Sequence, residues 1–386
     1  MKTQPHIPYG RQSISEEDIQ AVVDVLKSDF LTQGPQVAAF EKSICDYTGA
    51  KYCVVVANGT AALHIAVASL ELPVGSEGIT SPITFTASAT SMAYCGLEPR
   101  FADIDETTLC LSPKAFKNAI NPKTRLVTPV HFAGRVCDMA LINLIAKAKG
   151  IRIIEDAAHA IGSDYQDGGK VGSCKYSDMT IFSFHPVKTI TTGEGGAVTT
   201  NNPELYARLQ LLRSHGITKD PCLLQKNPGP WYYEMQSLGF NYRMTDIQAA
   251  LGVSQMKRLD MFKARRLEII KQYNEGFRAL SWLNTPCETF QESFCYHLYI
   301  VRIDWEKLGK SRVDVMAELK GKGILTQVHY IPVHTQPFYQ QNYGTKVGDF
   351  PCAEAYYEQA LSLPLYQGME DSDVKHVIDS VKVGKS

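Results

Sequence analysis

The stretch that decides the fold is Ile-Arg-Ile-Ile-Glu-Asp-Ala-Ala-His-Ala, residues 151–160. It opens with a short apolar run and continues into two carboxylates followed by small residues. Similar apolar runs precede it along the chain, the last of them at 126–130. The segment 139–149, between that run and this one, has helical periodicity and is ended by Gly150. Strands alternating with helices of this length predict an α/β fold whose mainly parallel sheet is covered on both faces. Strands are predicted at 52–56, 78–81, 99–103, 126–130, 151–155, 179–184 and 196–200.

The last third of the chain has a different pattern. One long charged helix is predicted from 246 to 277, and such a helix commonly bridges two domains. A strand at 295–303 and helices at 313–322 and 354–361 then predict a small α+β domain. We therefore expect a large domain over residues 1–250, followed over 251–386 by the linking helix and the small domain. The proline-containing stretch 221–233 is interpreted as a long ordered loop with a function.

Composition narrows the class of protein. The chain has 386 residues, of which 44% are hydrophobic and 20% charged, as in a globular enzyme. Its 39 Lys and Arg against 40 Asp and Glu argue against a nucleic-acid binder, which needs a basic face. The 10 cysteines include no C-x-x-C pair, so reduced thiols and no structural metal are expected. Neither a leader peptide nor a bilayer-spanning stretch is recognised, and a cytoplasmic location is expected.

Parallel sheets bind ligands at the carboxyl ends of their strands, so the residues after each strand are candidates. After the first strand, Gly59 and Thr60 open a helix whose free N–H groups suit a phosphate, although such residues alone are more often an ordinary helix cap. After the strand at 151–155, Asp156 can meet a cationic ring nitrogen or cap a turn. His159 alone is more often structural. Phe85, just after another strand, can stack on a planar ring or belong to the core.

Lys188 gives the sharpest signal. It follows the strand at 179–184 and stands among apolar, hydroxyl and glycine residues, not in a charged run. Partial desolvation favours the neutral amine, which forms a Schiff base with an aldehyde. A phosphate cradle, a stacking aromatic ring, a carboxylate and an amine together are the four functions that pyridoxal phosphate requires.

With these motifs in place, the chain resembles the sugar-nucleotide aminotransferases of the DegT/DnrJ/StrS family over nearly its whole length. The resemblance rests on the motifs N-G-T (58–60), T-F-T-A-S (84–88), E-D-A-A-H-A (155–160), F-S-F-H-P-V-K (182–188), G-E-G-G (193–196), R-S-H-G (213–216) and G-F-N-Y-R-M-T-D-I-Q-A-A (239–250). It implies the aspartate-aminotransferase-like type I fold and a homodimer with active sites at the subunit interface.

The resemblance also implies roles for the candidates. Lys188 would hold pyridoxal phosphate and then act as general acid and base, while Asp156 would pair with the pyridine nitrogen. Phe85 would stack on the ring and His159 would lie beside it. Cofactor phosphate would be bound by Gly59, Thr60, Ser183 and, from the partner subunit, Asn241.

Within the family, the segments 31–34, 183–188, 191–196 and 327–330 resemble those of the aminotransferases of pseudaminic acid biosynthesis. Those enzymes use L-glutamate to aminate a UDP-linked 4-keto sugar and give UDP-4-amino-4,6-dideoxy-N-acetyl-β-L-altrosamine. Lys27, Arg243 and His329 are expected to attract the diphosphate. The expected substrate contacts are Tyr9, Asp29, Phe30, Leu31, Thr32, Val328, His329, Tyr330 and Ile331, together with Gly59, Ser183 and Asn241 of the cofactor site.

Three alternatives remain at this point. A sugar dehydratase of the same family would have histidine where this chain has Lys188. A non-catalytic ligand sensor would not need Lys188, Asp156 and Ser183 together. An aminotransferase for another keto sugar nucleotide, with a D-configured sugar or a dTDP carrier, keeps all of these residues.

Overall fold

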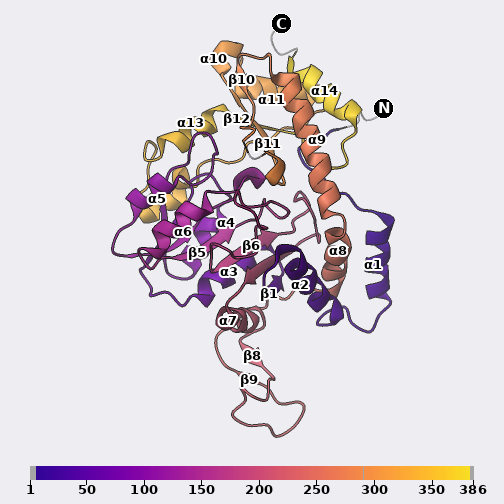
Figure 1. Ribbon diagram of the computed structural model, residues 1–386, viewed down its shortest axis with the longest axis vertical. Coiled ribbons are helices and arrows are strands. Elements are labelled where there is room, and N and C mark those ends of the chain that lie inside the picture. Colours follow the sequence, from indigo (N-terminus) through magenta and orange to yellow (C-terminus); the bar gives the residue numbers. More distant parts are fainter. Residues whose placement is uncertain (1–5, 290, 383–386) are drawn as a thin grey trace.

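The computed structural model describes residues 6–289 and 291–382 and has an α/β architecture (Figure 1). Its main sheet has seven strands in the order β1-β7-β6-β5-β4-β2-β3. All neighbours in it run parallel except β7, which is antiparallel to both β1 and β6. The mainly parallel sheet predicted from the sequence is thus confirmed. Its strands are β1 Tyr52–Val56, β2 Glu77–Thr80, β3 Glu98–Phe101, β4 Thr124–Thr128, β5 Arg152–Asp156, β6 Met179–Ser183 and β7 Gly196–Thr200.

Alternate residues of these strands enter two separate hydrophobic cores. Val55 and Ile153 point into the larger core, whereas their neighbours Val54 and Ile154 point into the smaller one. Both faces of the sheet are therefore covered, as a parallel sheet requires. The helices are α1 Glu16–Leu26, α2 Pro35–Thr48, α3 Gly59–Ser69, α4 Ala87–Tyr94, α5 Pro113–Ala119, α6 Met139–Lys147, α7 Pro203–Arg213, α8 Asp246–Met256, α9 Leu259–Phe277, α10 Trp305–Leu308, α11 Arg312–Gly321, α12 Pro337–Tyr343, α13 Pro351–Gln359 and α14 Asp371–Lys382.

The long helix predicted over 246–277 is two helices, so that expectation is corrected. The chain leaves helical geometry at Arg258, whose φ is −108° and ψ is 2°. The Arg258 guanidinium donates hydrogen bonds to the Ser13 carbonyl and to Asp18, and it lies over the Phe262 ring. The break lets α8 bury a face of small residues against α1 and α2, while α9 runs on toward the C-terminal sheet.

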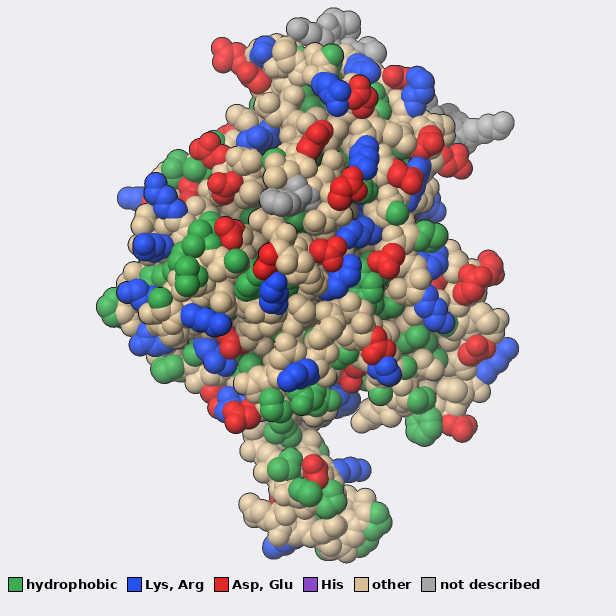
Figure 2. Space-filling model, in the orientation of Figure 1, with side chains coloured by type: hydrophobic (Ala, Val, Ile, Leu, Met, Phe, Trp, Pro, Cys, Tyr) green, Lys and Arg blue, Asp and Glu red, His purple; other side chains and the backbone are tan. Residues whose placement is uncertain are grey.

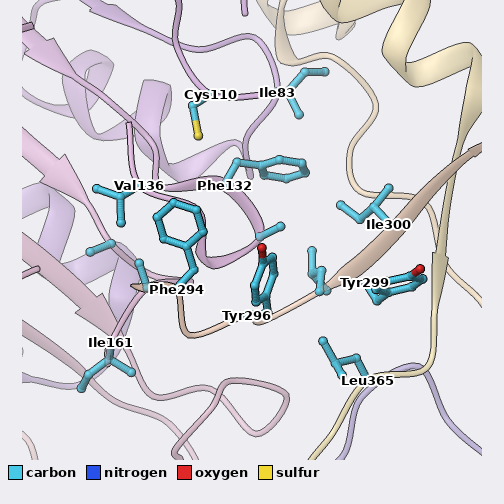
Figure 3. Packing of buried hydrophobic residues seen from close by; sticks show 14 of the residues in the cluster. Ile83, Cys110, Phe132, Val136, Ile161, Phe294, Tyr296, Tyr299, Ile300 and Leu365 are labelled. Carbon is cyan, nitrogen blue, oxygen red and sulfur yellow. The ribbon is translucent and has the colours of Figure 1, made fainter. Parts of the chain in front are cut away.

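That C-terminal sheet is antiparallel, with strands β10 Leu283–Asn284, β11 Tyr299–Ile303 and β12 Ala360–Leu363. Two predicted elements here differ from the structure by more than one residue. The predicted strand at 295–303 starts only at Tyr299, because the N–H groups of Cys295 and His297 bond to Ser163 and Ala133 in other loops. The helix predicted over 354–361 ends at Gln359, since Ala360–Leu363 pairs with β11. Figure 3 shows Phe132, Phe294, Tyr296 and Ile300 packed together where this part meets the large sheet.

An arm projects from the body of the protein at the lower edge of Figure 1. It comprises residues 217–238, with strands β8 Ile217–Thr218 and β9 Glu234–Met235 paired antiparallel. Its loop contains the stretch 221–233 and is ordered around the Glu234 carboxylate, which accepts hydrogen bonds from the N–H groups of Gln225 and Lys226. Figure 2 shows apolar side chains on this arm, whereas positive and negative charges are mixed over the visible face of the body.

Within the described residues, no helix combines the length and the apolar character needed to cross a bilayer.

Candidate active site

Lys188 lies in the turn that follows β6. Its N–H bonds to the His185 carbonyl at 2.9 Å, and the Phe184 carbonyl accepts from the N–H of Thr192 at 3.0 Å and the hydroxyl of Thr191 at 2.9 Å. These bonds fold the 184–195 loop back on itself. Burial lowers the pKa of the Lys188 amine to about 8, partly opposed by the charge of Asp156. About a tenth of the amine is therefore neutral at pH 7, far more than for an ordinary lysine.

Asp156 ends β5, the strand beside β6, and only 5% of its surface is exposed. One carboxylate oxygen, Oδ2, accepts a hydrogen bond from the Ser88 hydroxyl at 2.6 Å. The other, Oδ1, accepts from the N–H of Ala158 at 3.1 Å. Because the Ser88 hydroxyl donates its proton to Asp156, its oxygen accepts the hydrogen bond from the Thr84 hydroxyl at 2.7 Å. Asp156 is therefore fixed in orientation before any ligand arrives.

A second buried network, on the opposite face of the strand, holds the end of β5. The Glu155 carboxylate accepts from the hydroxyls of Tyr165 at 2.8 Å and Thr180 at 3.1 Å, and also from Ser177. His131 Nδ1 accepts from a backbone N–H at 3.2 Å, so its Nε2 carries the proton and donates to Glu155 at 2.7 Å. Four donors thus converge on one carboxylate that is fully buried.

The start of α3 forms another side of the site. Asn58 caps the helix by accepting from the N–H of Ala61 at 2.8 Å, while the first helical N–H groups, of Gly59 and Thr60, have no intrahelical acceptor. A Cβ on Gly59 would approach the Ser183 Cβ to 2.9 Å, so only glycine allows this contact. Free N–H groups beside a serine hydroxyl suit a phosphate group.

His159 and Phe85 complete this side. Phe85 is 60% exposed, so it does not belong to the core. His159 is buried, and its Nδ1 accepts from the N–H of Ala133 at 3.3 Å while Nε2 lies 3.3 Å from the Tyr330 hydroxyl. Burial and the charge of Lys188 hold the pKa of His159 well below its usual range. His159 is therefore neutral at pH 7.

Loops form the facing side. Tyr9 packs against His329 with ring centres 5.4 Å apart, and His329 Nδ1 lies 2.8 Å from the Ser362 hydroxyl. Burial lowers the pKa of His329 to about 4, so this ring is also neutral at pH 7. It can therefore offer a hydrogen bond to a diphosphate but no charge.

These groups enclose one cavity of about 1100 Å³, which we call the main cavity. The predicted residues that line it are Tyr9, Gly59, Thr60, Phe85, Asp156, His159, Ser183, Lys188, Val328, His329, Tyr330 and Ile331. Asn241 and the segment 29–32 are exposed and do not line the cavity of a single chain, and neither do Lys27 and Arg243. Asn241 was expected to act on a partner's cofactor, and all of these roles stay predictions.

Sequence reasoning missed several lining residues. Ser88 and Thr84 lie in a motif that was noticed, and their spacing of four near the start of α4 could have indicated a paired contact. His297 lies in an apolar stretch interpreted only as a strand, and no local signal marks it.

The donor set fits pyridoxal phosphate. A preoriented carboxylate, an amine whose pKa is lowered, an exposed aromatic face and free helix N–H groups meet in one cavity. A Cβ on Gly59 would lie 2.9 Å from the Ser183 Cβ, so glycine lets the start of α3 approach Ser183 closely enough for both to bind one phosphate group. Asp156 would hold the ring nitrogen, and Gly59, Thr60 and Ser183 would hold the phosphate.

Comparison with known proteins agrees with this geometry. The sequence profile of the DegT/DnrJ/EryC1/StrS aminotransferase family matches residues 12–382. The spore coat polysaccharide biosynthesis protein SpsC of Bacillus subtilis is 42% identical over 379 residues, covering 97% of this chain and 96% of that protein.

Solved structures are similar over the same length. The PseC aminotransferase of Helicobacter pylori, involved in the biosynthesis of pseudaminic acid, superposes with a TM-score of 0.91 at 31% identity, covering 98% of this chain and 99% of that one. The PLP form of the sugar aminotransferase Spr1654 of Streptococcus pneumoniae, itself described as putative, gives 0.89 at 32% identity, covering 98% of each chain. The type I fold expected from the motifs is confirmed. We conclude that this chain belongs to the DegT/DnrJ/EryC1/StrS aminotransferase family and is a pyridoxal-phosphate-dependent sugar aminotransferase.

Proposed function

We propose that the protein transfers the amino group of L-glutamate to C4 of a UDP-linked 4-keto-6-deoxy-N-acetylhexosamine. The product is then UDP-4-amino-4,6-dideoxy-N-acetyl-β-L-altrosamine, a precursor of pseudaminic acid. The observation that carries this proposal is the main cavity, which joins Lys188 and Asp156 to the 327–331 segment in a chain so similar to PseC. The motifs 31–34, 183–196 and 327–330 support the same substrate.

When bound, pyridoxal phosphate supplies an electron sink for the charge that develops at the carbon losing a proton. Asp156 would keep a proton on the ring nitrogen, because its carboxylate is held in place by Ser88 and Ala158. Lys188 would hold the cofactor, and its amine would take the proton from the donor's α-carbon. A pKa of about 8 suits this general base near neutral pH.

Other side chains would hold the cofactor beside Asp156 and Lys188. Phe85 would cover one face of its ring, and neutral His159 would lie at the ring edge. Gly59, Thr60 and Ser183 would bind the phosphate. In the amination of the sugar, Lys188 returns a proton to the carbon that receives the amine.

The facing loops are proposed to bind the sugar nucleotide. Tyr9, His329 and Tyr330 offer polar groups along the cavity, and Val328 and Ile331 offer apolar contact. Asp29–Thr32 and Asn241 lie outside the cavity of one chain, and we propose that they reach a substrate and a cofactor phosphate across a subunit interface.

We further propose that the protein is a homodimer with its active sites at that interface. Among the described residues, Lys188 is the only lysine or arginine that lines the main cavity, so a diphosphate lacks a cation in the single chain. The arm carries exposed apolar side chains that a second copy would bury. Its exposed apolar residues are Leu223, Trp231, Tyr233, Met235 and Leu238.

The function is tested by incubating the protein with glutamate and a panel of 4-keto UDP and dTDP sugars, with NMR of each product. Amination of the UDP-linked L-arabino ketose to the L-altro amine is expected. A product only from a dTDP sugar or a D-configured sugar would contradict the proposed substrate and keep the family assignment.

A second substrate is favoured by one comparison. SpsC shares 42% identity with this chain, more than the 31% shared with PseC. The alternative substrate is therefore another keto sugar nucleotide, used for a different surface polysaccharide. The same panel of keto sugars distinguishes it from the proposed substrate.

A further inference from the structure

His297 is a buried histidine at the base of the main cavity. Only 3% of its surface is exposed, and its ring centre lies 4.4 Å from that of His159. Two residues earlier, the Cys295 thiol lies 3.8 Å from the hydroxyl of Thr189, the residue that follows Lys188. His297 therefore lies beside His159, in a segment that also contacts the turn carrying Lys188.

Its backbone is fixed on both sides. The N–H of His297 donates to the Ala133 carbonyl at 2.9 Å, and its own carbonyl accepts from the buried Arg266 guanidinium at 3.2 Å. The N–H of Ala133 in turn donates to His159. The close approach needs glycine at 134, where a Cβ would lie 2.1 Å from the Cys295 carbonyl oxygen. The two histidines are thus held as one unit.

The position of the ring proton follows from hydrogen-bond partners. Nδ1 of His297 is fully buried and has no partner among the described residues. Burial and the charge of Lys188 hold the pKa of His297 well below its usual range, so the ring is neutral and carries one proton. A proton on Nδ1 would bury a donor without an acceptor, whereas a proton on Nε2 can serve a ligand in the cavity. An apolar side chain would pack here without any unpaired nitrogen, which argues for a function.

We propose that His297 Nε2–H donates a hydrogen bond to the α-carboxylate of the amino-acid donor. This inference rests on the proposed function, because Lys188 must reach the donor's α-carbon and the carboxylate is bonded to that carbon. No arginine and no second lysine line the cavity in the part of the chain that the structure describes. Both nitrogens of His159 already have partners, at Ala133 and Tyr330. His329 is also neutral and lines the cavity, but it lies against Tyr9 on the side proposed to bind the sugar nucleotide, so His297 is assigned to the carboxylate of the amino-acid donor.

The test uses three variants of the cofactor-loaded enzyme. H297L removes the donor, H297Q keeps an N–H near the position of Nε2, and H297N keeps one near Nδ1, away from the cavity. Calorimetry gives the affinity for 2-oxoglutarate, which binds the pyridoxal form without reacting, and for UDP as a control. Stopped-flow absorbance gives kcat and KM for the glutamate half-reaction. Circular dichroism and thermal melting check the fold of each variant.

H297L and H297N are expected to weaken 2-oxoglutarate binding by about tenfold or more, whereas H297Q stays within about threefold of wild type. UDP binding should not change. Equal affinities in all variants, equal losses in H297Q and H297N, or a parallel loss of UDP binding would overturn the proposal. If H297L does not fold, the difference in 2-oxoglutarate affinity between H297Q and H297N still tests the proposal.

The His297 assay contains no keto sugar, so it can be interpreted even if the proposed sugar substrate is wrong. Conversely, a failed His297 test leaves the product panel unaffected.

Discussion

The two walls of the main cavity are built differently. On the sheet wall, Asp156 and Lys188 end or follow adjacent strands and are held by buried hydrogen bonds of their own. On the loop wall, Tyr9 and the 328–331 segment come from distant parts of the chain. The Tyr9 ring packs against His329, while the two segments bond to β12 and to the residues after it, His329 to Ser362 and Tyr9 to Leu365. The chemistry is thus assigned to the sheet wall, and the choice of substrate to the wall that can vary without disturbing the sheet.

Replacing Lys188 should reduce kcat more than any other substitution. A smaller loss would contradict the assignment of the chemistry to the sheet wall. K188A is expected to lose at least about 10⁴-fold in kcat with either substrate, because no other base lies at the α-carbon. Borohydride should no longer fix the cofactor to the chain. K188R is the matched control, since it keeps the charge and should be equally inactive. Appreciable turnover by K188A would contradict the role of this wall.

The pKa of Lys188 predicts a pH dependence in cofactor capture by the apoenzyme. Below pH 8 the amine is protonated, so the rate of covalent capture should rise about tenfold per pH unit and level off above about pH 8. An ordinary lysine would level off only near its usual pKa and would be ~300-fold less neutral at pH 7. Stopped-flow absorbance between pH 6 and pH 11 measures this in buffers of about equal ionic strength. A rise that continues past about pH 10 would contradict a desolvated Lys188.

D156N should lower kcat by about 100-fold or more in both half-reactions, because an amide does not hold a proton on the ring nitrogen. The measurement is single-turnover absorbance with glutamate and separately with the keto sugar. A loss in only one half-reaction would show that Asp156 acts on a substrate and not on the cofactor.

S88A should cost about tenfold in kcat, since it removes one of the two hydrogen bonds that orient Asp156. T84A, one bond further from Asp156, is the control and should cost less. Equal KM values for both substrates are expected in S88A. A change confined to KM would place Ser88 in substrate binding.

On the loop wall, H329A and Y9A are expected to raise KM for the sugar nucleotide by about three- to tenfold and to leave the glutamate half-reaction near wild type. Calorimetry with UDP checks the same effect without turnover. If both variants bind the sugar nucleotide as tightly as the wild type, the proposed placement of the substrate is wrong.

The sheet wall could be predicted from the sequence to a large extent. Buried strands leave continuous apolar runs, so β1 and β7 begin and end where predicted and β5 is displaced by a single residue. The candidates Asp156 and Lys188 follow such runs directly. The break at Arg258 could not be predicted, because it depends on Ser13 and Asp18, more than two hundred residues away.

The sequence by itself determined the alternation of strands and helices, the family and the amine–carboxylate pair, since each depends on residues that are neighbours in the chain. Only the tertiary structure decided that Ser88 orients Asp156, that His297 comes beside His159, and that Asn241 lies outside the cavity of one chain. The physical reason is that hydrogen bonds and desolvation depend on what surrounds a side chain in space. Residues distant in sequence supply most of those surroundings.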